Sequence, residues 1–346
     1  MRRERTSNFE ILRIISMCGI IAIHYLAGHL GGMVVNPVFP SFDWFLSQVV
    51  YSIACPLVNC FVLISGYFLI NRNTFSLRRS IELIIITMFY GMVGYCIGLL
   101  TGTASVSIKN IIFAAIPFFA GKRWFVETYI ILILLAPFIN KILLAIDKKS
   151  FQILLVVQTL IFSGWYSLGL SAPLLDDGYG IINFITLYLV GAYCKLYGEE
   201  LFLWKIKRCY LMLGYIICTL ITFVLSYFIY PFGYAFITNV IGSVFVFIYF
   251  ARLQVGCNQR INAISAAAFD VYFVHSVMYT SRLLIYELLQ GKLFVGSVWM
   301  IVHMFAAIVI LYFFGVISHK LRTYIFSKSV SKWLDQLPII NITHRI

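Results

Sequence analysis

Ten long apolar stretches run through this chain of 346 residues, and they constrain its fold more than any other feature. A helix of about 20 apolar residues crosses the hydrocarbon core of a bilayer. Lipid offers no hydrogen-bond partner to an open backbone, so such stretches must be helical. We therefore expect an all-α, polytopic transmembrane bundle. Its spans are predicted near residues 9–29, 44–70, 81–100, 124–144, 151–171, 181–197, 209–229, 235–252, 263–283 and 294–318.

The composition agrees with a membrane protein. The chain is 62% hydrophobic and 11% charged, whereas about a quarter of a soluble domain is charged. A net charge of +13 is also found in nucleic-acid-binding proteins, but here the basic residues sit in short loops between the spans. That distribution argues against a nucleic-acid partner. The eight cysteines form no CxxC pair, so we expect neither a disulfide nor a metal site.

The loops alternate between basic and neutral, with exceptions at Lys109, Lys122, Arg123, Arg282 and Lys292, and this alternation predicts the orientation of the bundle. Arg2, Arg3 and Arg5 place the N-terminus in the cytoplasm, and loops 30–43, 172–180 and 230–234 carry no lysine or arginine. An even number of spans returns the C-terminus to the cytoplasm. We expect a transmembrane domain over residues 1–325 and a cytoplasmic tail over 326–346. The predicted cytoplasmic segments carry Arg72, Arg78, Arg79, Lys148, Lys149, Lys205, Lys207, Arg208, Arg260, Lys320, Arg322, Lys328 and Lys332.

One apolar stretch is too short to cross a bilayer. Residues 108–120 are interrupted by Pro117, and we interpret them as a re-entrant or interfacial helix.

The first predicted span contains two ionisable side chains, Arg13 and His24, which lipid cannot solvate. Eleven positions separate them. At about 100° per residue, eleven steps return to within about 20° of the starting direction and rise about 16 Å. Glu10, three residues before Arg13, shares that face. We expect this face to line a protein cavity rather than to meet lipid.

Five motifs, in order along nearly the whole chain, resemble the membrane acyltransferase-3 family. They are Phe9-Glu-Ile-Leu-Arg13 followed by ten residues and His24; Phe61-Val-Leu-Ile-Ser65-Gly66-Tyr67, like the family's "SG" motif; Arg78-Arg79, at its basic loop; Trp124-Phe125 with Tyr129 and Pro137; and Phe269-Asp-Val-Tyr272-Phe-Val-His275, like its "Y-x-x-H" segment. Glu82 departs from the pattern, because family members often carry another arginine three residues after the basic pair.

The resemblance implies a membrane O-acyltransferase. Members acylate surface polysaccharides, lipopolysaccharide, peptidoglycan or small glycosylated molecules. The resemblance further implies acetyl-CoA as the donor, no permanently bound cofactor, and a surface glycan or lipid-linked oligosaccharide as the acceptor. The location would be the bacterial inner or plasma membrane. The sequence leaves the oligomeric state and the acceptor sugar open.

His24 is the first candidate catalytic residue. An alcohol needs a base to remove its proton, and imidazole has a suitable pKa. His24 alternatively accepts the acyl group itself, or is a structural histidine bonded to a neighbouring span. Arg13 is a candidate for binding the phosphates or a carbonyl of the donor, alongside a salt bridge with Glu10. The resemblance assigns Arg78 and Arg79 to the donor as well.

Glu127 is the second candidate catalytic residue. It either orients His24 or acts as a further acid or base, so we expect both to line one cavity near the outer surface; the alternative is an interfacial carboxylate. Trp124, Arg123 and His275 are candidate acceptor-binding residues. For Arg123 and Lys122 the alternative is interfacial snorkelling. For His275 it is a structural role, which we also expect of His303, whereas His29 is expected in a loop and His319 in solvent.

A transport function is the alternative class. A flippase or permease for lipid-linked sugars also has many spans, and Arg13 and His24 would then be polar gates. The order of the five motifs favours the acyltransferase, because transport does not require it.

Overall fold

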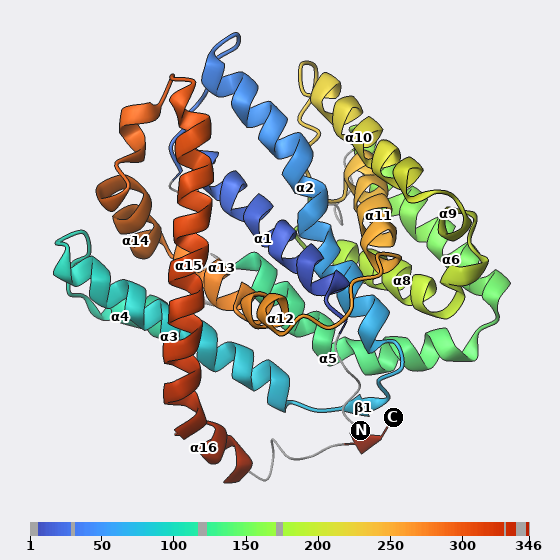
Figure 1. The fold of residues 1–346 in the computed structure, drawn as a ribbon. Helices are drawn as coiled ribbons and strands as arrows, with labels where there is room; N and C mark the ends of the chain where they lie inside the picture. The colour runs from blue at the N-terminus through green and yellow to red at the C-terminus, as the bar shows by residue number, and fades with distance from the viewer. Residues whose placement is uncertain are drawn as a thin grey trace.

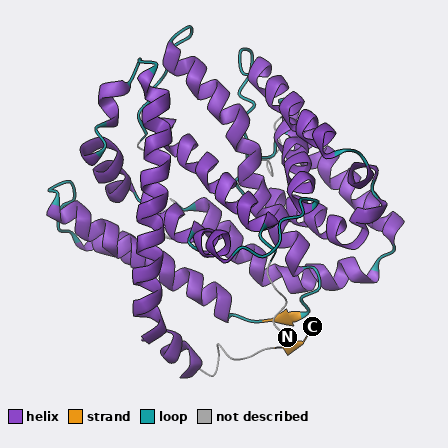
Figure 2. Cartoon of the chain, viewed as in Figure 1, coloured by secondary structure: helices purple, strands orange, loops and turns teal. Residues whose placement is uncertain are grey.

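The computed structural model describes residues 6–28, 32–116, 123–170, 176–328, 330–336 and 344–345. Within these ranges the chain is predominantly helical, with two strands of two residues each (Figures 1 and 2). Eight of the described helices are long and apolar enough to cross a membrane. The all-α polytopic bundle predicted from the sequence is therefore confirmed.

The eight long helices coincide with eight of the ten predicted spans. They are α1 (Asn8–Leu26), α2 (Phe42–Leu69), α3 (Arg78–Leu100), α5 (Trp124–Ala145), a continuous segment made of α6 (Lys148–Thr159), η3 (Leu160–Gly164) and α7 (Trp165–Ser167), α8 (Ile181–Tyr197) with η4 (Gly198–Glu200), α10 (Arg208–Leu225) and α15 (Trp299–Lys328).

The other two predicted spans are helical but irregular. The segment predicted at 235–252 is α11 (Ile237–Ala251), which has only 15 residues. The segment predicted at 263–283 is broken. Helices α12 (Gln259–Ala266) and α13 (Ala268–Ser276) are followed by α14 (Met278–Ser281) and η5 (Arg282–Leu288), with a bend of 82°.

The remaining described elements are short. They are β1 (Thr74–Phe75), α4 (Ile108–Ala115), α9 (Phe202–Lys205), η6 (Gly291–Phe294), α16 (Val330–Gln336) and β2 (His344–Arg345). With eight residues, α4 does not span, as expected. Pro117 and Lys122, which follow it, and His29 lie outside the described residues.

Side-chain caps fix where several helices begin. Ser41 accepts the backbone N–H of Trp44 at 3.2 Å at the start of α2, and Asp147 accepts that of Ser150 at 3.1 Å at the start of α6. The hydrogen bonds from Ser150 hold the pKa of the exposed Asp147 carboxyl below its usual value. These polar residues therefore mark helix boundaries at the ends of apolar segments.

Helix α2 lies at the centre of the bundle, where it packs against α1, α8 and α11. Two glycines allow α2 and α8 to approach closely. A Cβ atom on Gly66 would lie 2.1 Å from the carbonyl oxygen of Tyr188, and one on Gly191 would lie 2.1 Å from that of Leu63. Small residues at such positions let helix backbones pack against each other in a membrane.

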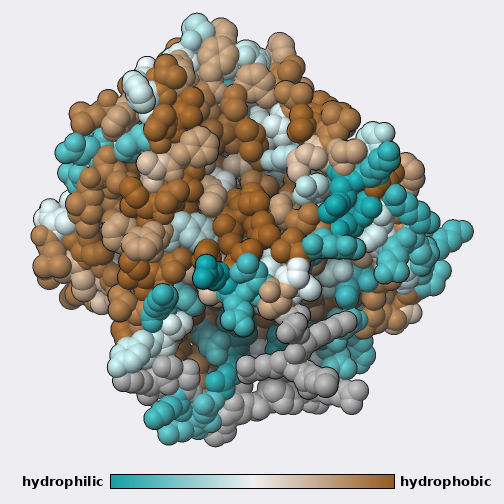
Figure 3. Space-filling model, viewed as in Figure 1, coloured by the Kyte–Doolittle hydropathy of each residue, from teal (hydrophilic) through white to brown (hydrophobic). Residues whose placement is uncertain are grey.

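The outer surface of the bundle is apolar. Figure 3 shows a broad brown surface on this side, with hydrophilic residues gathered toward its lower and right-hand edges. Large apolar side chains are exposed along α15, at Val302, Phe305, Val309, Phe313 and Leu321. They recur at intervals of three, four and eight residues, so one stripe of this helix faces outward toward lipid.

Both ends of the described chain lie at the same face of the bundle, which we call the N-terminal face because α1 begins there. The ring of Phe9 at the start of α1 packs 5.1 Å from that of Tyr67 at the end of α2. Shortly after α2, β1 pairs antiparallel with β2, with Thr74 opposite Arg345. This arrangement (Figure 1) agrees with an even number of spans.

The last helix differs from its predicted span. It begins at Trp299 rather than near residue 294 and continues to Lys328, beyond the predicted end at 318. As a result, His319 and Arg322 lie on α15 instead of in a basic tail. The expectation that His319 is solvated was wrong, because its Nδ1 atom lies 2.8 Å from a carboxylate oxygen of the buried Asp270.

Candidate active site

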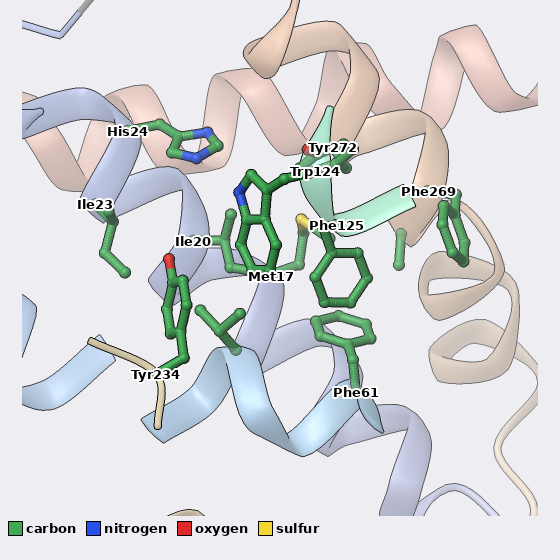
Figure 4. Close-up of a pocket in the computed structure, with 12 residues that line it drawn as sticks. Met17, Ile20, Ile23, His24, Phe61, Trp124, Phe125, Tyr234, Phe269 and Tyr272 are labelled. Atoms are coloured by element: carbon green, nitrogen blue, oxygen red, sulfur yellow. The ribbon is translucent and has the colours of Figure 1, made fainter. Parts of the chain in front are cut away.

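His24 lines an apolar pocket inside the bundle, which we call the His24 pocket and which is shown in Figure 4. The rings of His24 and Tyr234 lie on one side of it, those of Phe61, Phe125 and Phe269 on the other, and Trp124 lies between them. The full lining is Met17, Ile20, Ile23, His24, Val58, Phe61, Trp124, Phe125, Tyr234, Ala268, Phe269 and Tyr272. Helices α1, α2, α5 and α13 and the loop before α11 thus build the pocket together.

The polar face predicted for α1 meets protein rather than lipid, but His24 is its only member that lines the pocket described above. Glu10 accepts a hydrogen bond from the Ser265 hydroxyl of α12 at 2.6 Å. Farther along α1, the His24 ring lies 5.0 Å from that of His275 and 6.3 Å from that of Tyr272, both on α13. One face of α1 therefore packs along two consecutive helices.

His275 is the histidine that the structure brings to His24. Its side chain is 1% exposed, and its Nδ1 atom lies 2.6 Å from the carbonyl oxygen of Val271. Its Nε2 atom is buried and has no hydrogen-bond partner among the described residues. His275 is not part of the pocket lining, so it lies behind His24 rather than beside the cavity.

Arg13 forms the salt bridge with Glu10 that the spacing predicts, at 2.5 Å. Glu10 is buried, while the Arg13 side chain is 21% exposed. Neither residue belongs to the lining of the His24 pocket. The role of Arg13 in binding the donor stays a prediction.

The loop of residues 231–236 supplies Tyr234, which sequence reasoning missed. All six residues are buried. The Asn59 side chain donates to the carbonyl of Tyr234 at 2.9 Å, and that of Asn239 donates to the carbonyl of Gly233 at 2.8 Å. Non-helical backbone at membrane depth needs such partners. The Tyr234 ring then stacks on Trp124, with centroids 5.2 Å apart.

Arg123 points into the bundle and not toward a membrane surface. It is 9% exposed, and its guanidinium donates to the carbonyl of Thr87 at 3.3 Å and lies 5.6 Å from the ring centroid of Phe273. The snorkelling alternative for Arg123 was therefore wrong. Its binding of an acceptor stays a prediction.

Glu127 lies one turn after Arg123, and its backbone N–H donates to the carbonyl of Arg123 at 3.2 Å. Its Oε1 atom is buried and has no hydrogen-bond partner among the described residues. It is not among the residues that line the His24 pocket, whereas Trp124 is. A cavity shared by His24 and Glu127 stays a prediction.

A second pocket, which we call the basic pocket, opens at the N-terminal face between α2, α3 and α5. Its lining is Leu69, Arg72, Ser76, Arg78, Arg79, Glu82, Tyr129 and Ile133. Arg78 is paired with Asp335 at 2.6 Å and with Glu82 at 3.3 Å, and Arg79 with Glu82 at 3.5 Å. The Arg72 side chain has no ion-pair partner among the described residues, so the pocket keeps a surplus of positive charge.

Tyr129 lies between the two pockets. It lines the basic pocket, and its hydroxyl lies 3.2 Å from that of Ser65. Its ring stacks on Phe125 and lies 5.9 Å from that of Phe269, and both of these line the His24 pocket. One layer of aromatic rings therefore separates the basic pocket from the His24 pocket.

A buried ion pair anchors α13 to α15, and sequence reasoning missed it. Asp270 is 1% exposed and accepts hydrogen bonds from Arg322 at 3.0 Å and from Tyr90 at 2.7 Å, besides its contact with His319. The available signal was a lone acid in a predicted span, with His319 and Arg322 three residues apart near the last one.

A family model described as an acyltransferase domain, that of the acyltransferase-3 family, matches residues 7–320. No curated protein and no solved structure gives a match. The matched range contains every residue that lines the two pockets.

Proposed function

As a member of the acyltransferase-3 family, this chain is a multi-pass membrane acyltransferase, and we propose that it O-acetylates a bacterial surface polysaccharide or its lipid-linked precursor. The donor is acetyl-CoA, and the location is the bacterial inner or plasma membrane. The N-terminal face is then cytoplasmic. The observation that carries the proposal is the pair of pockets, one basic and one with His24, on either side of Tyr129.

The basic pocket suits the polyanionic end of the donor. Arg72, Arg78 and Arg79 all line it, and guanidinium groups bind phosphates through paired N–H donors. The thioester at the far end of the pantetheine arm would pass Tyr129 and reach the apolar pocket. Arg13 would assist from α1, where Glu10 holds its guanidinium.

The apolar pocket suits the transfer itself. His24 takes the proton from the acceptor hydroxyl as its oxygen attacks the thioester carbonyl. A C–O bond forms and the C–S bond breaks. The proton then passes from His24 to the CoA thiolate, so the enzyme returns to its starting state. The apolar lining excludes water, which would otherwise compete as the acceptor.

The acceptor side of the pocket is aromatic. Trp124 and Tyr234 form a stacked pair beside His24, and flat aromatic rings suit the apolar face of a sugar. Glu127 and Arg123 lie at the start of the same helix as Trp124. Glu127 and Arg123 would either bind the acceptor or orient the side chains of the site.

The test uses purified protein in nanodiscs with radiolabelled acetyl-CoA, together with mass analysis of surface glycan from cells. Wild type should release CoA thiol and acetylate the glycan. His24→Ala should lose both, while His303→Gln is the matched control. The His303 imidazole bonds to Tyr25 and to the carbonyl of Leu289 outside the pocket lining.

The same experiment separates the enzyme from the transport alternative. A flippase for lipid-linked sugars would move its cargo without releasing CoA thiol. Full thiol release by a well-folded His24→Ala protein would remove His24 from the mechanism.

A further inference from the structure

We propose that His275 is a positioning residue that holds His24 in one tautomer, by accepting a hydrogen bond from a ring N–H of His24. The other ring nitrogen of His24 is then the one that takes the proton of the acceptor hydroxyl. This inference rests on the proposed function, in which His24 moves the proton of the acceptor.

The tautomer of His275 follows from its first contact. Its Nδ1 atom lies 2.6 Å from the carbonyl oxygen of Val271, one turn earlier on α13. A carbonyl oxygen only accepts hydrogen bonds, so Nδ1 must carry the hydrogen. In a neutral imidazole the other nitrogen, Nε2, is then an acceptor. The hydrogen bond to the helix backbone thus determines that Nε2 is the nitrogen of His275 that can accept a hydrogen bond.

This acceptor nitrogen of His275 receives no hydrogen bond from the part of the chain that the structure describes. Nε2 is buried and has no hydrogen-bond partner among the described residues. A buried polar atom without a partner is unfavourable, and such atoms in folded proteins call for an explanation such as a catalytic role. A simple packing role would be better served by an apolar side chain of similar size.

The His24 ring is the group within reach. Its centroid lies 5.0 Å from that of His275, and the two planes are tilted by 47°. An imidazole nitrogen lies about 1.1 Å from its ring centre, so a direct N–H···N bond of about 2.9 Å places two centroids about 5 Å apart. A small rotation of His24 therefore completes the bond, and catalytic hydrogen bonds often tighten only when substrate is bound.

A neutral partner fits this pocket better than a carboxylate would. His275 and Tyr272 are the ring neighbours that α13 brings to His24, and every residue that lines the pocket besides His24 is apolar or aromatic. Asp270, on the same helix as His275, is occupied by Arg322, His319 and Tyr90. An imidazole supplies the orienting acceptor of a catalytic triad without placing a charge in apolar surroundings.

His275 does not pass the proton onward. Its own Nδ1–H is held by a backbone carbonyl, which is too weak a base to take it. When His24 becomes an imidazolium, its hydrogen bond to Nε2 becomes charge-assisted and therefore stronger. The expected effect is on the chemical step and not on donor binding.

Two substitutions of His275 distinguish the role of its Nδ1 atom from that of its Nε2 atom. His275→Asn keeps an N–H near the position of Nδ1, which bonds to Val271, but has no acceptor at the position of Nε2. His275→Gln places its amide oxygen near the position of Nε2. We expect His275→Asn to lower kcat about 10- to 100-fold with KM for acetyl-CoA unchanged, and His275→Gln to retain kcat within about threefold. Equal kcat for two folded variants would overturn the proposal.

A second measurement does not depend on acyl transfer. Diethylpyrocarbonate carbethoxylates the free nitrogen of a neutral imidazole, and peptide mass mapping gives the rate at His24. That rate should fall in His275→Asn and persist in His275→Gln. If wild type transfers no acyl group but the labelling follows this order, the proposed function fails and the histidine pair stands. If wild type transfers acyl groups and His24 is carbethoxylated at the same rate in both variants, the proposed function stands and the proposed role of His275 is wrong.

A third measurement uses only the wild-type protein, so its result does not depend on whether the His275 variants fold. In solid-state NMR of wild type with nitrogen-15 histidine, His275 should show a protonated Nδ1 and an unprotonated Nε2. A protonated Nε2 would overturn the assignment.

Discussion

The ring of Tyr129 lies nearly parallel to that of Phe125, with centroids 6.1 Å apart and planes at 14°. Phe125 belongs to the His24 pocket and Tyr129 to the basic pocket, so this pair forms the partition between them. The donor arm must pass this partition in the proposed reaction, and water must not.

Removing the Tyr129 ring should therefore uncouple donor cleavage from transfer. We expect Tyr129→Ala to raise the ratio of acetyl-CoA hydrolysis to glycan acetylation, because water gains access to the thioester. Tyr129→Phe keeps the ring and loses only the contact with Ser65, at a cost of about 1 kcal/mol. Thiol release and glycan acetylation, measured in parallel, give the ratio. An unchanged ratio in Tyr129→Ala would mean that the ring does not separate the pockets.

Arg72 should contribute more to donor binding than Arg78. Arg78 is paired with Glu82 and Asp335, whereas Arg72 has no ion-pair partner among the described residues. We expect Arg72→Ala to weaken acetyl-CoA binding about tenfold and Arg78→Ala to weaken it less, measured by calorimetry at two salt concentrations. Lys149→Ala, outside the pocket lining, is the control. The reverse order would place the donor phosphates nearer Arg78.

Gly66 should tolerate no side chain. A methyl group there would lie 2.1 Å from the carbonyl oxygen of Tyr188, so α2 and α8 would have to separate. We expect Gly66→Ala to destabilise the protein by about 1–3 kcal/mol, measured as a lower unfolding temperature in detergent. Gly256→Ala is the matched control, because a Cβ atom on Gly256 would have no other atom within 4 Å. Equal unfolding temperatures would contradict the close approach of the two helices.

The Asp270–Arg322 pair should be costly to break from one side. Asp270→Asn leaves a buried guanidinium without its counter-charge, which costs about 3–5 kcal/mol. The double substitution Asp270→Leu with Arg322→Met removes both charges and should recover most of that loss. Chemical unfolding of the single and double variants tests this. A double variant no more stable than Asp270→Asn would show that the ion pair itself is required.

The N-terminal face should be cytoplasmic. Reporter fusions after Lys149 and Arg208 should read as cytoplasmic, and a fusion near Asp176 as external, because the basic loops select the cytoplasm. The opposite readings would place the basic pocket outside the cell, away from acetyl-CoA.

The apolar spans and the α1 face were predictable because each follows from local periodicity. A separation of eleven positions between Arg13 and His24 fixes their common direction on any helix, and the structure places that face against α12 and α13. Pairings between distant segments were not predictable. The contact of Asp270 with Arg322 joins residues 52 positions apart, and no single-sequence pattern states which helices will be neighbours.

Residues of the site were predictable from the sequence only where they belong to one of the five motifs. His24 and Trp124 belong to motifs, and both line the pocket. Tyr234 belongs to none and lies at the edge of a predicted span, yet Asn59 and Asn239 hold its loop inside the bundle. Such a loop depends on the hydrogen bonds of its own backbone to other helices, and the identity of Tyr234 does not reveal them.

The pairing of β2 with β1 has a practical consequence for handling the protein. Thr74, in β1, pairs with Arg345, and Asp335 is bonded to Arg78 in the basic pocket. An affinity tag fused at the C-terminus would therefore emerge beside the proposed entrance for acetyl-CoA. Tags and fluorescent fusions for kinetic work belong in a loop at the opposite face, or should be cleaved before acetyl-CoA binding is measured.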